Sequence, residues 1–180
     1  SRNLINKFLK LIGKLLRPLP YDTWHTIATD VRIRLRPAGH VLGSNLFEIE
    51  LPDHKRVVFS GDLGTGHDPI LRPPELPERA DLMVLESTYG DRLHDRPEDR
   101  QSALESILRK TLADKGITVI PAFSLGRTQA LLYEMNGIFE HLQATEGRSL
   151  MKQVDVIVDS PLATRFTQIY ESLQDFWSIE

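Results

Sequence analysis

The chain has 180 residues, of which 41% are apolar and 26% charged, an ordinary balance for a globular protein with one core or two incomplete ones. Its net charge of -3 excludes a polycation, so nucleic-acid binding must come from a local basic groove. The absence of cysteine excludes disulfides, thiolate catalysis and Cys-ligated zinc, and it fits a cytoplasmic protein. No apolar run is long enough to span a membrane, so we expect no membrane partner.

The first half of the chain predicts one helix and then a set of strands. Residues 4–16 are apolar with lysines at helical spacing, and we expect an amphipathic helix that packs on a sheet rather than on a membrane surface. Pro18 and Pro20 end this helix. Strands are predicted at residues 31–35, 45–51, 56–60 and 82–86, the first three as an antiparallel meander. The arginines at 32, 34 and 36 form either a basic site or an ordinary exposed strand face.

The second half of the chain predicts alternating helices and strands. Residues 97–115 have an apolar stripe at helical spacing, with Gly116 as the expected C-cap. Strands at 117–121 and 154–158 then alternate with helices at 126–139 and 163–177, separated by a polar loop at 143–149. This order implies a parallel sheet covered by helices. We therefore expect two α/β units, residues 1–116 and residues 117–180.

Three polar residues follow directly on predicted strands. They are His40, Asp62 and Glu86. If these strands share a sheet, His40 and Asp62 converge at one rim, where imidazole and carboxylate together suit zinc, manganese or iron. Each residue also has an ordinary interpretation, because His40 could be a turn residue, Asp62 could form an Asx turn and Glu86 could pair with an arginine.

The sequences around these residues resemble those of a known family. The matching segments are PAGHVLGS at 37–44, FSGDLG at 59–64, ESTYG at 86–90, IPAFSLGRTQALLY at 120–133 and DSPLA at 159–163. Their order and spacing resemble the β-CASP branch of metallo-β-lactamase-fold RNA nucleases. This branch contains the eukaryotic pre-mRNA 3′-end endonuclease and its prokaryotic relatives.

The resemblance implies a fold and a chemistry. The expected fold class is α/β, with part of the αββα metallo-β-lactamase layers followed by the start of a Rossmann-like β-CASP unit. His40 would ligate one of two Zn²⁺ ions and Asp62 would bridge them, so that a metal-activated water attacks a phosphodiester of single-stranded RNA. Glu86 would orient a histidine that protonates the leaving oxygen, which makes Asp62 and Glu86 the expected catalytic residues.

Residues of the second unit are candidates for phosphate binding. Ser160 and Pro161 fit a helix N-cap followed by proline, and Arg127 stands in the first turn of another predicted helix. Helix N-termini bind phosphate well, so Ser124, Arg127 and Ser160 are candidates for contact with the RNA backbone. We favour simple capping for Ser160 and leave both interpretations open for Arg127.

The metal site is incomplete in this sequence. The family motif His-x-His-x-Asp-His is missing, since no two of the six histidines are close enough to form it, and the spacing of His67 and Asp68 is wrong for a substitute. The chain is therefore expected to be either a fragment of a longer enzyme or a short homologue without metal, binding zinc weakly or not at all by itself and cutting no RNA.

Alternative functions are a non-catalytic β-CASP scaffold subunit and a small-molecule metallo-hydrolase of the same superfamily. The sequence leaves open a homodimer, the RNA preference and the choice between endonucleolytic and exonucleolytic cutting.

Overall fold

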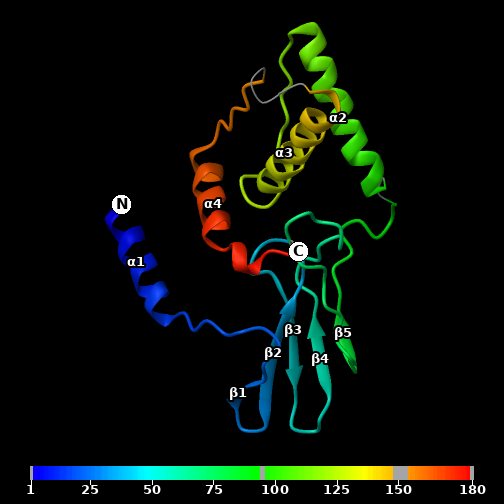
Figure 1. Cartoon of the computed structure of the whole chain (residues 1–180). Helices are drawn as coiled ribbons and strands as arrows, with labels where there is room; N and C mark the ends of the chain where they lie inside the picture. The colour runs from blue at the N-terminus through cyan, green and yellow to red at the C-terminus, as the bar shows by residue number, and fades with distance from the viewer. Residues whose placement is uncertain (1, 94–95, 148–153, 179–180) are drawn as a thin grey trace.

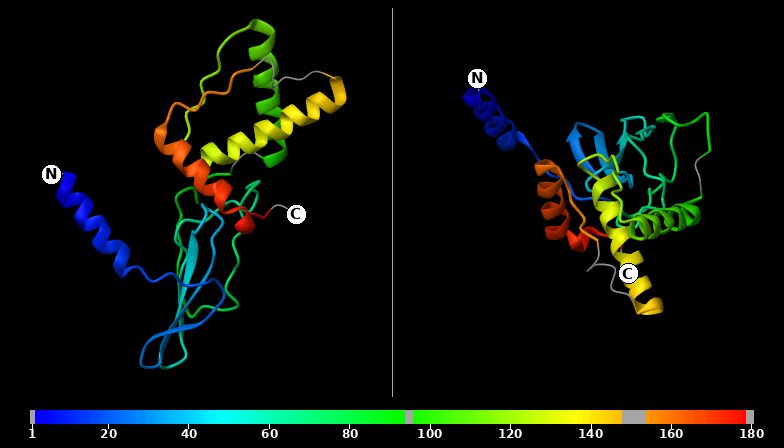
Figure 2. Two further views of the ribbon diagram at one scale, coloured as in Figure 1. Left: turned by 60° about the vertical axis from the view of Figure 1, so that its left-hand side comes forward. Right: turned by 90° about the horizontal axis from the view of Figure 1, so that it is seen from above.

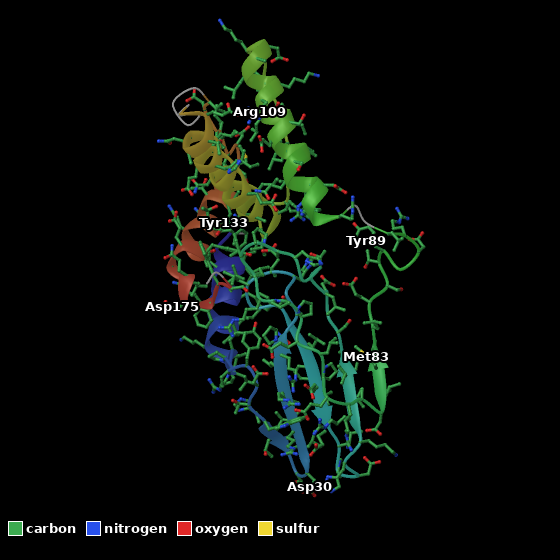
Figure 3. All side chains as sticks on the ribbon, turned by 45° about the vertical axis from the view of Figure 1, so that its right-hand side comes forward. Asp30, Met83, Tyr89, Arg109, Tyr133 and Asp175 are labelled. Carbon is green, nitrogen blue, oxygen red and sulfur yellow. The ribbon has the colours of Figure 1, made fainter. Side chains whose placement is uncertain are left out.

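The computed structural model describes residues 2–93, 96–147 and 154–178, with a sheet at one end and three helices at the other (Figure 1). Asp30 marks the far tip of the sheet, whereas Tyr133 and Arg109 lie among the helices (Figure 3). The predicted α/β fold class is confirmed. The elements in chain order are α1 (Arg2–Leu15), β1 (His25–Ala28), β2 (Val31–Pro37), β3 (Asn45–Glu50), β4 (Arg56–Phe59), β5 (Leu82–Val84), α2 (Pro97–Asp114), α3 (Arg127–Glu146), α4 (Pro161–Ser172) and the short 3₁₀ helix η2 (Gln174–Phe176).

The sheet has the strand order β1-β2-β3-β4-β5. The first four strands are antiparallel neighbours, and β5 pairs with β4 in parallel. The parallel pair requires a long crossover, which the proline-rich stretch between β4 and β5 supplies. The strands predicted for the first half of the chain are confirmed, and β1 is an additional strand. Strands β2, β4 and β5 therefore run in one direction and end on the same side of the sheet.

A buried ion cluster joins β2 to β3. Arg34 lies opposite Glu48 in the strand register, and the fully buried Glu48 carboxylate accepts hydrogen bonds from Arg34 Nη2 at 3.0 Å and Arg36 Nε at 2.6 Å. Arg32 Nε donates to Glu50 at 2.7 Å in the same way. The arginines are thus paired with carboxylates, and Arg34 is buried rather than on an exposed strand face. The basic binding site on this strand stays a prediction.

An aromatic ring completes this ion cluster. The guanidinium carbons of Arg32 and Arg34 each lie 4.7 Å from the centroid of the Trp24 ring, and that of Arg56 lies 5.3 Å away. Such stacking is favourable, particularly where water is excluded. The polar face of this sheet is therefore a covered layer of paired charges.

Helix α1 does not pack on the sheet as predicted. Its apolar side chains are exposed, with Leu4 70%, Phe8 61% and Leu15 69% accessible, and the helix projects away from the sheet in two views (Figures 1 and 2). An amphipathic stripe shows that one face of a helix can be buried, but it does not specify the surface that buries it. Among the described helices, none is long and apolar enough to cross a membrane.

The helices of the second half pack on one another. Leu104 and Leu108 of α2 meet Met135, Ile138, Phe139 and Leu142 of α3 in one buried cluster. The predicted helices are confirmed, with changes at their ends. The helix predicted at 163–177 begins at Pro161 and ends at Ser172, and η2 follows it. Helix α3 extends to Glu146, into the predicted loop, and Lys115 rather than Gly116 takes the left-handed conformation after α2, with φ 52°.

The two strands predicted for the second half do not form. Residues 117–121 and 154–158 lie outside every helix and strand that the structure assigns. Their apolar side chains are exposed, with Ile117 92%, Val119 84% and Ile157 84% accessible. β-branched residues favour a strand only where a neighbouring strand pairs with the backbone and covers the side chains. The division of the chain after residue 116 stays a prediction.

A small apolar cluster attaches the helices to the end of the sheet. Tyr170 of α4 packs with Ile70 and Leu71, and Leu42 and Trp177 border the same cluster. The backbone N–H of Ser178 also donates to the carbonyl of Ile70 at 2.7 Å. The loops at this end of the sheet are therefore held between the strands and the helices.

We predict that Glu48→Ala lowers the free energy of unfolding by about 3–5 kcal/mol, because it leaves the guanidinium of Arg34 buried without its carboxylate partner. Urea denaturation followed by tryptophan fluorescence measures this change. Glu75→Ala is the control, since its carboxylate is partly exposed and lies 3.8 Å from Arg36, and we expect a change below about 1 kcal/mol. Equal unfolding midpoints for the two variants would contradict the prediction.

Candidate metal centre

Two turns at one rim of the sheet bring His40 and Asp62 together. The first turn follows β2 and the second follows β4, and these strands end on the same side because β3 runs antiparallel to both. His40 Nε2 lies 3.9 Å from Asp62 Oδ2. Both side chains are accessible to solvent, the imidazole by 48% and the carboxylate by 78%. The predicted convergence is confirmed, while the metal-binding roles of the two residues stay predictions.

The turn that carries His40 is held by the hydroxyl of Ser44. Ser44 Oγ accepts the backbone N–H groups of His40 at 3.0 Å and Val41 at 3.2 Å. Tyr21 O–H donates to the Ser44 carbonyl at 3.1 Å, and the Tyr170 hydroxyl accepts the N–H of Leu42 at 3.4 Å. Hydrogen bonds from three separate parts of the chain therefore fix the backbone that positions the imidazole.

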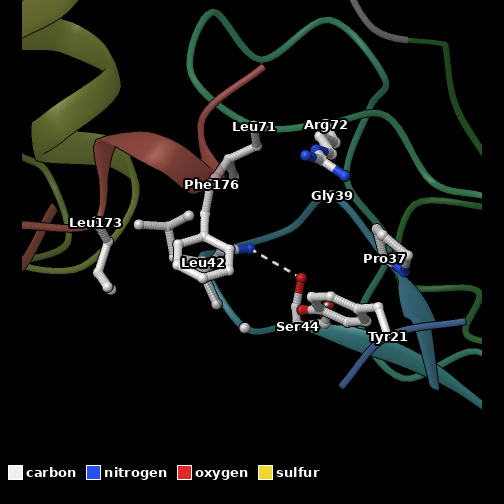
Figure 4. A pocket seen from close by; sticks show the side chains of 11 residues that line it. Tyr21, Pro37, Gly39, Leu42, Ser44, Leu71, Arg72, Leu173 and Phe176 are labelled. Atoms are coloured by element: carbon white, nitrogen blue, oxygen red, sulfur yellow. Dashed lines mark hydrogen bonds between the residues drawn. The ribbon is translucent and has the colours of Figure 1, made fainter. Parts of the chain in front are cut away.

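A pocket of about 280 Å³ adjoins this turn (Figure 4). Its wall is mainly apolar and includes Leu42, Leu71 and Phe176, and Arg72 is also at its edge. Phe176, from the C-terminal segment, therefore lies near the turn that carries His40.

The two turns touch through their backbones. The N–H of Gly64 donates to the carbonyl of Ala38 at 2.8 Å. A β-carbon on Gly64 would lie 1.7 Å from the carbonyl oxygen of Gly39, far inside any permitted contact. Gly39 itself has φ +67°, which glycine adopts at little cost. The short separation of His40 and Asp62 therefore depends on glycine at both positions.

Glu86 follows β5 and reaches the turn that carries Asp62. Its Oε1 accepts the backbone N–H of Leu63 at 2.7 Å, and its Oε2 accepts the hydroxyl of Thr88 at 2.7 Å. The hydrogen bond from Thr88, followed by that from Leu63, lowers the pKa of the Glu86 carboxyl from its ordinary value. Glu86 is thus held as a carboxylate beside the candidate metal ligands, and its proposed contact with a histidine stays a prediction.

Ser124 and Ser160 meet at the N-termini of α3 and α4. Their hydroxyl oxygens lie 3.2 Å apart. Ser160 Oγ also accepts the N–H of Ala163 at 3.2 Å, so the predicted capping role is confirmed. Arg127 is exposed at the start of α3 and has no ion pair with any residue in the described ranges. The phosphate-binding role of these residues stays a prediction.

Gln129 is a buried residue that organises this junction. Its side-chain carbonyl accepts the N–H of Gly126 at 2.8 Å, and its amide nitrogen donates to the carbonyl of Ser124 at 3.2 Å and the hydroxyl of Thr167 at 3.0 Å. Sequence reasoning missed it because a glutamine in a helix is usually exposed. The sequence signal for this role is a glutamine three residues after the helix cap, because its side chain can fold back and accept the backbone N–H of the cap residue.

The helical half also contacts the turn that carries His40. A β-carbon on Gly126 would lie 3.1 Å from Cγ1 of Val41. The beginning of α3 is therefore next to His40 in space, although 86 positions separate Gly126 from His40 in the sequence. The candidate phosphate-binding residues and the candidate metal ligands lie in neighbouring parts of one surface.

Comparisons with known proteins find relatives of this chain. The chain is 34% identical over 165 residues to Ribonuclease TTHA0252 of Thermus thermophilus, covering 92% of this chain and 36% of that protein. It is 31% identical over 136 residues to Cleavage and polyadenylation specificity factor 73 of Drosophila melanogaster, and 37% identical over 120 residues to Endoribonuclease ysh-1 of Neurospora crassa. These matches cover 75% and 66% of this chain, and 19% and 14% of the two proteins.

The chain belongs to the β-CASP family of metallo-β-lactamase-fold proteins. It spans about a third or less of the length of these curated relatives. No family model matches it.

The donors of this β-CASP chain fit part of a zinc site. Two ligands on one tetrahedral zinc, with bonds of about 2.0–2.2 Å, lie about 3.4 Å apart, so the separation of His40 and Asp62 needs only a small adjustment. In the described ranges, no group of three or more His, Asp or Glu residues is arranged to hold a metal. Asp68 accepts the N–H groups of Ile70 and Leu71 and acts as a turn residue.

We predict that Gly64→Ala separates the two turns of this β-CASP chain and lowers its melting temperature, because the new methyl group would overlap the backbone of Gly39. Gly137→Ala is the matched control, since Gly137 lies in α3 with nothing within 4 Å of the added carbon. There we expect a stabilisation of up to about 1 kcal/mol. Differential scanning calorimetry compares the variants, and an unchanged melting temperature for Gly64→Ala would show that the close approach is dispensable.

Proposed function

We propose that the natural protein containing this sequence is a zinc-dependent hydrolase of RNA phosphodiester bonds. The observation that supports this proposal is the 3.9 Å approach of His40 and Asp62 at the rim of the sheet. It occurs in a chain that is similar over 92% of its length to a protein named a ribonuclease. Two further relatives, at 31% and 37% identity, are named a cleavage and polyadenylation specificity factor and an endoribonuclease, which favours RNA over a small molecule as the substrate.

His40 and Asp62 would provide part of a two-zinc site. The neutral imidazole of His40 would bind one ion, and the carboxylate of Asp62 has two oxygens with which to bridge both. Bound zinc supplies a nucleophile near neutral pH by lowering the pKa of its water, and it stabilises charge on the phosphate oxygens. The remaining ligands would come from parts of the natural protein outside these 180 residues.

Ser124, Arg127 and Ser160 would bind the backbone of single-stranded RNA. The N-termini of α3 and α4 carry partial positive charge, and Arg127 adds a full charge that no described carboxylate pairs with. Because the start of α3 adjoins Val41, a strand held there would pass close to His40. These residues would thus place a phosphate near the metal centre.

The proposal includes a cytoplasmic location, which the lack of cysteine supports. A homodimer is compatible with the proposal.

We predict that Asp62→Ala in the full-length natural protein lowers the rate of RNA cleavage by at least about a hundredfold, because it removes the carboxylate that would bind both metals. Labelled single-stranded RNA, followed by gel electrophoresis with and without a chelator, measures the rate. His141→Ala is the control, as this exposed histidine lies in α3 away from the site.

Two results would overturn the proposed function. One is cleavage by Asp62→Ala at the wild-type rate, and the other is metal-loaded wild-type protein that leaves RNA intact, as expected of a non-catalytic scaffold. A circular RNA substrate additionally tests internal cutting, because only an endonuclease can open it.

A further inference from the structure

The position of the Asp62 side chain is not set by its own contacts. The carboxylate is 78% accessible, and it lies 3.9 Å from the imidazole of His40. A side chain so exposed can be aimed reproducibly only if the backbone beneath it is fixed. The direction of the Asp62 side chain therefore depends on the residues that hold the turn from Ser60 to Leu63.

Glu86 is bonded to this turn on both sides of Asp62. Before Asp62, the backbone N–H of Glu86 donates to the hydroxyl of the buried Ser60 at 3.0 Å. After Asp62, the N–H of Leu63 donates to Glu86 Oε1 at 2.7 Å. The ladder between β4 and β5 continues directly into these bonds, since the N–H of Ser60 donates to the Val84 carbonyl at 3.0 Å.

The carboxylate of Glu86 is itself held in place. Thr88 O–H donates to Oε2 at 2.7 Å, which leaves Oε1 directed at the amide of Leu63. Charge-assisted hydrogen bonds to a carboxylate are shorter and stronger than neutral ones, and both of these distances are short. The carboxylate therefore acts as a rigid acceptor for the backbone that follows Asp62.

We propose that Glu86 is a positioning residue for Asp62, holding the Asp62 turn through the amide of Leu63. This role requires no contact between Glu86 and a histidine. The proposal rests on the proposed function only in treating Asp62 as a metal ligand, and the hydrogen bond that carries it is independent of RNA.

Three variants of Glu86 in the full-length natural protein test this role. Glu86→Gln keeps an oxygen acceptor at the same reach but loses the charge. Glu86→Asp keeps the charge but withdraws the acceptor by one methylene, and Glu86→Ala removes it. Glu75→Ala is the matched control, since it removes a partly exposed carboxylate that lies 3.8 Å from Arg36 and makes no contact with the Leu63 amide.

Hydrogen–deuterium exchange at the Leu63 amide is the first measurement. We expect exchange about tenfold faster in Glu86→Ala and Glu86→Asp, in line with the loss of one hydrogen bond to a charged group. Glu86→Gln, which keeps the acceptor without its charge, should exchange more slowly than these two variants, and Glu75→Ala should exchange like the wild type. The Gly64 amide, bonded to Ala38, reports whether a variant has lost the surrounding fold.

Affinity for Zn²⁺ by calorimetry is the second measurement. Loss of a residue that supports a ligand weakens metal binding by about 10–100-fold, which we expect for Glu86→Ala and Glu86→Asp but not for Glu86→Gln. Unchanged Leu63 exchange in Glu86→Ala would overturn the proposal. So would a loss of protection in Glu86→Gln with retention in Glu86→Asp, because charge rather than reach would then matter. Wild-type protein that binds zinc without cutting RNA would contradict the proposed function and leave this inference standing.

Discussion

The candidate metal centre depends on a contact between two backbones. Gly64 approaches the backbone of Gly39 so closely that no side chain could stand at position 64, and a side chain at Gly39 would meet the loop at Arg72 and Pro74. One hydrogen bond, from Gly64 to Ala38, then fixes the two turns relative to each other. The sheet brings the ends of β2 and β4 to one rim, but this contact sets the final separation of His40 and Asp62.

Much of the fold and part of the site could be predicted because they follow from local patterns. Alternation predicted β2 and β3, a short apolar run predicted β4, and a helical stripe predicted α2. The convergence of His40 and Asp62 followed from strand direction alone. The remaining features depend on partners that no local pattern specifies. Residues 117–121 and 154–158 have β-branched sequences but lack a neighbouring strand, and the stripe of α1 does not identify the surface that would bury it.

Polar residues were the hardest to interpret from the sequence. The arginines of β2 looked equally suited to a binding site or an exposed strand face, and only the register of β3 shows that Glu48 and Glu50 pair with them. Gln129 bonds partly to residues far along the chain, and Thr88 bonds to Glu86 only because of the local turn. Neither residue therefore stood out in the sequence. The functional importance of Glu86 came from a family resemblance, whereas its bond to Leu63 came from the structure.

Residues 117–121 and 154–158 affect the tendency of this chain to aggregate. Ile117, Val119 and Ile157 are exposed on backbone that lies outside any sheet of the structure. Apolar, β-branched segments outside a sheet can pair with strands of other molecules. Whenever these segments are uncovered, during synthesis or in isolation, aggregation would begin there rather than at the paired charges of the β2–β3 face.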